Sequence, residues 1–302
     1  MSRSQSHSAM NRRTFIRTSS VATAALASMP GTVAPAAEPP AWQIGCFNRA
    51  WTKWSYDDAL DGIAAAGYKL TGLLSGHKGE AFTSSEATAE YLGGLKERLT
   101  KRGLAVNMTA IRFRPEAPLA ENIADLHKQI ANAAWLGIKF MLTFGVDNPA
   151  HYENFYRLMA DAAAEGEKHG LRIAMKPHGG SSGASEEILR CIEKVGHSNF
   201  TIWYDAGNII YYTGKDPVKE LDPIARYVTG FCAKDCSGPK GEVMSQLGTG
   251  KVDFRAVLAK LKSVGFSGPL MVEGVKVGST AEETTANALA NRQFLEKVSA
   301  TV

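Results

Sequence analysis

Four consecutive apolar segments in the second half of the chain end in ionisable side chains. These side chains are Lys176, Asp205, Lys234 and Glu273. Burying a charge costs several kcal/mol unless the group is paired or binds a metal, so we expect all four to meet in one pocket. There, a carboxylate of Asp205 or Glu273 can take a proton from a carbon next to a carbonyl. A lysine ammonium or a metal can stabilise the oxygen that gains charge.

The period of a strand predicts which neighbours accompany these residues. Side chains two residues apart share a face. This spacing pairs Lys176 with His178, Trp203 with Asp205, Cys232 with Lys234, and Met271 with Glu273. Asn208 follows Asp205 in the next loop and is a candidate for substrate binding.

Each of these residues also has a purely structural interpretation. Lys176 can extend to solvent, and His178 can hydrogen-bond within its Gly-rich turn. Asp205 and Glu273 can cap the turns that follow them, and Lys234 can pair with the adjacent Asp235. These interpretations are weaker for four neighbouring segments together than for any one residue alone.

The segments belong to a longer alternation of apolar runs and amphipathic stretches. Eight runs rich in β-forming residues lie at 42–47, 70–76, 104–111, 139–145, 171–176, 200–205, 228–234 and 269–274. The stretches between them carry acids early, bases late and glycine after the end, which is typical of helices. Repeated strand–helix units predict parallel strands, and eight units predict one (β/α)8 TIM barrel over residues 37–302. An open doubly wound sheet is the rival, but no G-x-G-x-x-G follows the first run.

Residues 1–36 differ in composition from the rest. Four arginines and no acid precede a run of small apolar residues and the A-x-A pattern at Ala34–Ala36. This layout predicts an export signal rather than a membrane span, and "NRRTFIR" (11–17) resembles a twin-arginine motif, which implies the periplasm. The net charge of +4 equals these four arginines. The remaining chain is neutral and favours neither nucleic acid nor a membrane surface as a partner.

The four cysteines are predicted to be buried free thiols. They are Cys46, Cys191, Cys232 and Cys236, and none forms a C-x-x-C motif. A zinc ribbon or a thioredoxin-type redox site is therefore not expected.

Several motifs from Leu171 onward resemble one known family. They are "KPHGG" (176–180), "WYDAGN" (203–208), "AKD" (233–235), "LGTGKVDF" (247–254) and "GPLMVEG" (268–274). They resemble the sugar phosphate isomerase/epimerase superfamily of xylose-isomerase-like barrels, which includes ketose 3-epimerases and endonuclease IV. The resemblance implies a divalent cation held by Glu, Asp, His and Glu from the last four strands. Asp205 and Glu273 match two ligands, whereas Lys176 and Cys232 stand where Glu and His are expected.

Two interpretations of Lys176 follow from this departure. In the first, its ammonium replaces the cation between Asp205 and Glu273. In the second, His178, Asp205 and Glu273 bind Mn²⁺, Mg²⁺ or Zn²⁺, with a thiolate of Cys232 as a further ligand. Lys176 would then contact substrate or, with a lowered pKa, act as a base.

Weaker candidates for substrate binding follow the first three apolar runs. Arg49, Trp51 and Trp54 could form a carbohydrate platform, although the tryptophans could equally pack in the core. His77, Arg112 and Arg114 could contact hydroxyls or a carboxylate, or be ordinary loop residues.

The expected function is a periplasmic isomerase- or epimerase-type enzyme acting on a small-molecule sugar or sugar derivative. One alternative is a lyase or hydrolase that acts on 3-keto-glycosides with the same chemistry. Another is a non-catalytic carbohydrate-binding barrel with a degenerate metal site. A nuclease is disfavoured by the neutral charge and the missing ligands.

Overall fold

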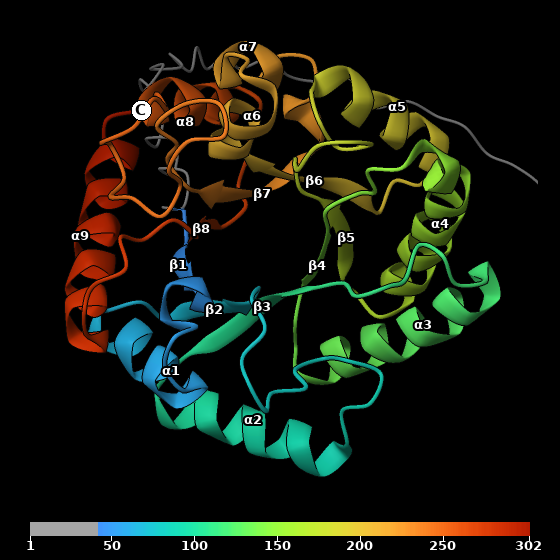
Figure 1. Cartoon of the computed structure of the whole chain (residues 1–302), viewed down its shortest axis with the longest axis horizontal. Helices are drawn as coiled ribbons and strands as arrows, with labels where there is room; N and C mark the ends of the chain where they lie inside the picture. Colours follow the sequence, from blue (N-terminus) through green and yellow to red (C-terminus); the bar gives the residue numbers. More distant parts are fainter. Residues whose placement is uncertain (1–41) are drawn as a thin grey trace, which may run out of the picture. The chain divides into compact units, whose positions relative to one another are not determined.

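The computed structural model of the protein describes residues 42–302; the expected export signal lies outside these residues. In the described part, eight parallel strands pair in sequence order, and β8 closes on β1 (Figure 1). The strands are β1 (Ile44–Phe47), β2 (Leu70–Leu73), β3 (Ala105–Ala110), β4 (Phe140–Thr143), β5 (Arg172–Met175), β6 (Phe200–Asp205), β7 (Val228–Ala233) and β8 (Leu270–Val272). The predicted (β/α)8 TIM barrel is confirmed, and each strand lies within its predicted apolar run.

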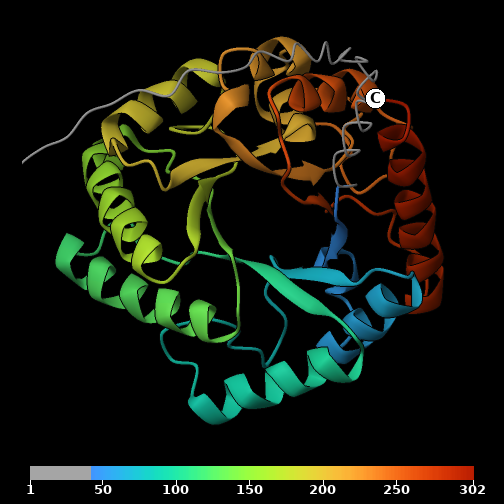
Figure 2. The ribbon, with the colours of Figure 1, turned by 180° about the vertical axis from the view of Figure 1, so that it is seen from behind.

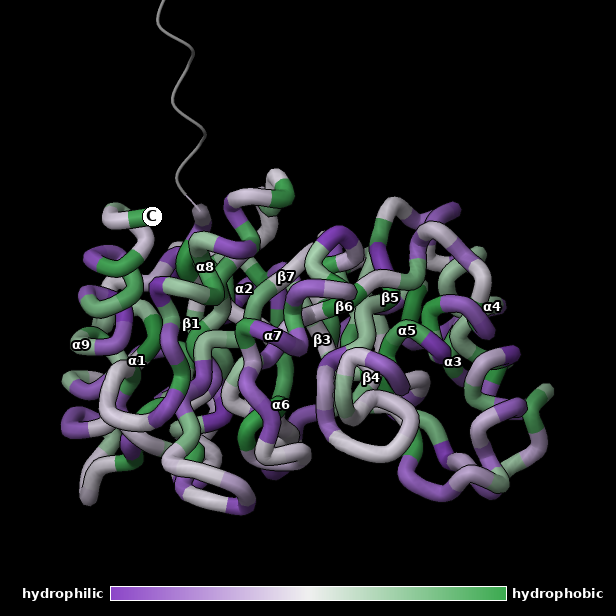
Figure 3. Tube along the Cα trace, turned by 90° about the horizontal axis from the view of Figure 1, so that it is seen from above, coloured by the Kyte–Doolittle hydropathy of each residue, from purple (hydrophilic) through white to green (hydrophobic). Residues whose placement is uncertain are grey.

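Helices surround the strands on all sides, as Figures 1 and 2 show from the two ends. The α-helices are α1 (Tyr56–Ala65), α2 (Ala89–Lys101), α3 (Leu119–Trp135), α4 (Tyr152–Lys168), α5 (Ser185–Val195), α6 (Ala206–Thr213), α7 (Pro217–Leu221), α8 (Phe254–Ser263) and α9 (Ala281–Ser299). Short 3₁₀ segments are η1 (Asn48–Trp51), η2 (Pro149–His151) and η3 (Ala225–Tyr227). In Figure 3, α9 alternates between hydrophobic and hydrophilic residues along its turns. Among residues 42–302, no helix has the length and apolar character needed to cross a membrane.

The helix ends follow from local sequence chemistry. Ser55 and Asp58 form a reciprocal capping box at the start of α1. Gly196 ends α5 in the left-handed conformation, with φ of 64°. All four cysteines are buried free thiols, as predicted.

The interior of the barrel is filled by side chains rather than open. A cluster separate from the main helix–strand core contains Phe47, Leu74, Met108, Leu142, Ala174, Trp203, Cys232 and Met271. Trp203 faces Gly230 on the neighbouring strand, and a Cβ at Gly230 would lie 2.2 Å from the indole ring. Glycine is therefore required at this position so that the large ring can fill the barrel.

Three interior residues determine where the charged side chains point. These residues belong to the interior cluster. Trp203 lies two residues before Asp205, Cys232 two before Lys234, and Met271 two before Glu273. Because strand residues two apart share a face, those charged side chains also project into the barrel, at the carboxyl ends of the strands.

We predict that Gly230→Ala lowers the free energy of unfolding by roughly 1–3 kcal/mol, because overpacking must displace the Trp203 ring. Gly94→Ala is the matched control, since a Cβ on Gly94 in α2 meets no atom within 4 Å. The control should stabilise the protein by about 0.5–1 kcal/mol. Urea denaturation of both variants measures the difference, and equal effects would contradict the interior packing described here.

Candidate active site

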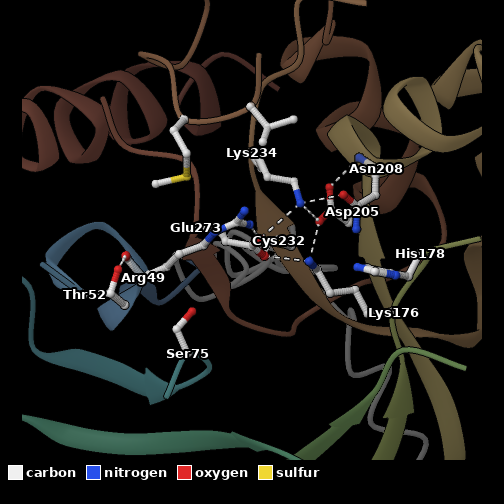
Figure 4. Close-up of polar contacts among 12 residues, drawn as sticks. Arg49, Thr52, Ser75, Lys176, His178, Asp205, Asn208, Cys232, Lys234 and Glu273 are labelled. Carbon is white, nitrogen blue, oxygen red and sulfur yellow. Dashed lines mark hydrogen bonds and ion pairs between the residues drawn. The ribbon is translucent and has the colours of Figure 1, made fainter. Parts of the chain in front are cut away.

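The side chains that end β5, β6 and β8 meet at one point (Figure 4). Lys176 Nζ lies 2.8 Å from Asp205 Oδ2 and 2.6 Å from Glu273 Oε2. The ammonium thus bridges two carboxylates from strands that are not adjacent to each other in the barrel. This is the convergence that the sequence predicts for the strand ends.

Lys234 forms a second bridge between the same carboxylates. Its Nζ lies 2.9 Å from Asp205 Oδ2 and 3.1 Å from Glu273 Oε1. It also donates a hydrogen bond of 2.6 Å to Asn208 Oδ1. The suggested pair with Asp235 is not formed, because Asp235 accepts backbone N–H groups of Cys236, Gly248, Gly250 and Val252.

Two further groups contact the Glu273 carboxylate. Arg49 donates to Oε1 from the segment after β1. The thiol of Cys232 donates to Oε2 at 2.9 Å. Both oxygens of Glu273 therefore already have two partners each.

Asp205 has two tasks, one on each oxygen. Oδ1 accepts the backbone N–H of Asn208 at 2.8 Å and caps α6, while Oδ2 faces the two lysines. Asp205 therefore caps the helix that follows it and also belongs to the charged cluster. Asn208 Nδ2 in turn donates a hydrogen bond of 2.5 Å to the carbonyl oxygen of Pro177, which links α6 to the end of β5.

The cluster is almost completely removed from water. Asp205 is 0% exposed, and Lys176, Lys234 and Glu273 are each 2% exposed. The two buried ammonium groups balance the two buried carboxylates, and Arg49, whose side chain is 34% exposed, adds a third cation in the wall of the cavity. At such burial an uncompensated charge is costly, so each of the four buried charges depends on its partners, while the partly exposed Arg49 presents a positive charge to the cavity.

The pKa directions follow from this charge balance. Burial alone would raise the pKa of Glu273, but Lys176, Lys234 and Arg49 outweigh it and hold the pKa well below its usual range. Burial likewise works against the charged form of Lys176, yet Asp205 and Glu273 raise its pKa well above the ordinary value. Lys176 therefore keeps its proton. This contradicts the idea from the sequence that it acts as a base with lowered pKa.

His178 lies beside the cluster rather than in it. Its Nε2 is 2.7 Å from the hydroxyl of Tyr212, and its ring centroid lies 5.4 Å from that of Phe144. Burial and the charges of Lys176 and Lys234 lower the pKa of His178. The imidazole is neutral at neutral pH.

One group of residues in the described chain has the spacing of metal ligands. Asp205, Cys232 and Glu273 each offer an atom within 4.8 Å of the others. His178, which the sequence places in the metal set, lies outside this group. Cys232 takes its place, but burial followed by the charges of Asp205 and Glu273 raises its thiol pKa well above the ordinary value.

The surroundings of these three residues do not fit a divalent cation. Asp205 Oδ2 and both oxygens of Glu273 already contact cationic groups, with two ammonium nitrogens at 2.6 to 3.1 Å. A divalent ion placed there would face these ammonium groups at close range, in a buried cluster whose two carboxylates are already balanced by two ammonium groups.

A cavity of about 370 Å³ opens onto the cluster. Its walls are Arg49, Leu74, Ser75, Phe144, Lys176, His178, Asn208, Tyr211, Tyr212, Lys234, Val243 and Glu273. Tyr211 and Tyr212 were missed from the sequence, because α6 was not predicted as a helix. The signal was present, since two adjacent tyrosines follow Asn208 within one helical turn.

Five of the candidate substrate-binding residues do not line this cavity. Trp51 is 0% exposed and packs in the core, so its role in a carbohydrate platform is wrong. Trp54 packs against the same core. His77 is hydrogen-bonded to the side chain of Asn48 at 2.9 Å and to the carbonyl oxygen of Trp51 at 3.3 Å. Arg112 and Arg114 also do not line the cavity.

We predict that Lys176→Met lowers the free energy of unfolding by about 3–5 kcal/mol, because it leaves buried carboxylates short of a cation. Lys219→Met is the matched control; its side chain is 84% exposed and lies 4.0 Å from Asp216. The control should change the free energy by no more than about 0.5 kcal/mol. Urea denaturation at neutral pH decides, and similar losses in both variants would contradict the buried ion cluster.

Comparisons with known proteins agree with this architecture. A crystal structure of a xylose isomerase domain protein from Planctomyces limnophilus is similar, with TM-score 0.67, 22% identity, and coverage of 87% of this chain and 99% of that chain. A D-tagatose 3-epimerase-like protein matches with TM-score 0.70, 16% identity, and coverage of 86% and 98%. A xylose isomerase-like TIM barrel protein from Mycobacterium smegmatis, solved with magnesium, matches with TM-score 0.69, 14% identity, and coverage of 86% and 97%.

At these identities the likeness establishes the fold, and no curated protein sequence matches the chain significantly. The model of one family, described as the xylose isomerase-like TIM barrel, matches residues 60–298. The chain therefore belongs to the xylose isomerase-like TIM barrel family.

Proposed function

We propose that the protein is an enzyme that transfers a proton next to the carbonyl of a sugar or sugar derivative. The observation that carries the proposal is the buried cluster of two lysines and two carboxylates, with the partly exposed Arg49 on Glu273, beside the cavity. Removing a proton next to a carbonyl creates an enediolate with one negative charge. A carboxylate that takes this proton becomes neutral, so the enediolate replaces the lost negative charge opposite the two buried ammonium groups and Arg49.

Glu273 is the proposed base. Its carboxylate lines the cavity, whereas Asp205 is fully buried behind the lysines. Glu273 takes the proton from the carbon, and the C–H electrons form the enediolate. Return of the proton to the same carbon completes hydrogen exchange, and its return to the neighbouring carbon gives the isomer. Asp205 is proposed to position the two lysines rather than to touch the substrate.

The two lysines and Arg49 are proposed to stabilise the enediolate oxygen. Glu273 has a lowered pKa and is a weak base, so the reaction depends on strong stabilisation of the product of proton removal. Charge-assisted donors in a site shielded from water supply such stabilisation. In this proposal the ammonium groups take the place of a divalent cation.

The D-tagatose 3-epimerase-like neighbour supports a sugar as the substrate class. Export to the periplasm rests on residues 1–36 alone and stays a prediction. A non-catalytic sugar-binding barrel is the competing outcome in the experiment that follows.

We predict that the protein exchanges carbon-bound hydrogen of a keto-sugar with solvent deuterium. D-Fructose, D-tagatose and 3-keto-glucose are incubated with protein in D₂O, and loss of the proton signal next to the carbonyl is followed by NMR. Glu273→Gln should slow exchange by about 10²–10⁴-fold, because the base is removed. Adding EDTA should leave the rate unchanged, as should the exposed control Lys219→Met.

Two results would contradict the proposal. Binding of these sugars without exchange would show a binding barrel. Exchange that disappears with EDTA and returns with Mn²⁺ would show that a metal, rather than the ammonium groups, stabilises the oxygen.

A further inference from the structure

A second cavity adjoins the one that opens onto the ion cluster. It has a volume of about 340 Å³, and its walls include Glu116, Asp147, Asn148 and His151. Phe144 and His178 line both cavities. The two spaces therefore share a boundary at these two side chains, and together they exceed what a single sugar ring needs.

The loops that form the second cavity are firmly built. The loop after β5 contains the Gly-rich segment 179–183, whose Ser181 and Ser182 are 2% and 0% exposed. Ser182 Oγ donates a hydrogen bond of 2.7 Å to the carbonyl oxygen of Phe144. Ser181 Oγ accepts a hydrogen bond of 2.9 Å from the backbone N–H of Val146. A Cβ at Gly180 would lie 2.4 Å from the carbonyl oxygen of Val146. Buried hydroxyl groups and close backbone packing thus hold the loop after β4 against the loop after β5.

The chemistry of the second cavity differs from that of the first. Glu116 and Asp147 provide exposed carboxylates, His151 an imidazole, and Phe144 a partly exposed aromatic face. Carboxylates accept hydrogen bonds from hydroxyl groups and repel phosphate or carboxylate ligands. An aromatic face packs against the C–H side of a sugar ring. These walls suit a neutral ring with several hydroxyls.

We propose that the substrate is a glycoside whose second sugar ring occupies the cavity over β4. The ring with the reacting carbon would lie against Lys176 and Glu273, and the glycosidic link would cross the boundary formed by the contacting rings of Phe144 and His178. This inference rests on the proposed function, because it takes the ion cluster as the reacting end. It narrows the substrate class from free monosaccharides to linked sugars.

Calorimetric titration of the wild-type protein tests the inference independently of turnover. Cellobiose, lactose and maltose are compared with glucose and galactose. At least one disaccharide should bind about tenfold or more tightly than its constituent monosaccharides, because the second ring adds contacts. In Asp147→Ala and in His151→Ala, the ratio of disaccharide affinity to monosaccharide affinity should fall toward one. Neither side chain makes a hydrogen bond within residues 42–302, so the fold should tolerate both changes.

Glu153→Ala is the matched control, since Glu153 is exposed in the first turn of α4 and lines neither cavity. It should keep the full preference for the disaccharide. Equal affinity for disaccharides and monosaccharides in the wild type, or a preference that survives both cavity variants, would overturn the inference. Failure of deuterium exchange would instead count against the proposed function, so the two ideas can fail separately.

Discussion

The structure depends on how the barrel keeps two carboxylates and two ammonium groups together away from water. Lys176 and Lys234 each bridge Asp205 and Glu273, and Arg49 adds a third contact to Glu273. Removing either lysine or either carboxylate would leave a fully buried charge short of a fully buried partner. The β5, β6, β7 and β8 strand ends are therefore tied to one another by charge as well as by their backbone ladder.

Strand geometry explains why these particular residues meet. Trp203, Cys232 and Met271 fill the barrel, and the residues two positions later continue on the same face to its carboxyl end. Lys176, Lys234 and Glu273 each lie one residue beyond the end of their strands, where the interior gives way to the cavity. The packed interior below holds the charges in place. Under the proposed function, little reorganisation of these charges is therefore required when the substrate gains negative charge.

The sequence predicted the strands and the convergent side chains because both follow from short-range periodicity. Apolar runs bounded by glycine indicate strands, and charged residues at their ends have few places to go except one pocket. Trp51 and His178 show where this reasoning stops. Whether Trp51 packs in the core or faces a ligand depends on contacts with α1 and α9, which are distant in sequence. His178 lies between Pro177 and Gly179, beyond the end of the strand, so strand alternation does not extend to it, and its ring contacts Tyr212 instead.

The central claim is that ammonium groups stand where a divalent cation would otherwise bind. Calorimetric titration of Mn²⁺, Mg²⁺ and Zn²⁺ into purified protein, followed by measurement of bound metal after dialysis, tests it directly. The account predicts that the wild type retains no ion, whereas Lys176→Glu, which replaces a cation with a third carboxylate, gains one site. One retained ion per wild-type chain would contradict the account.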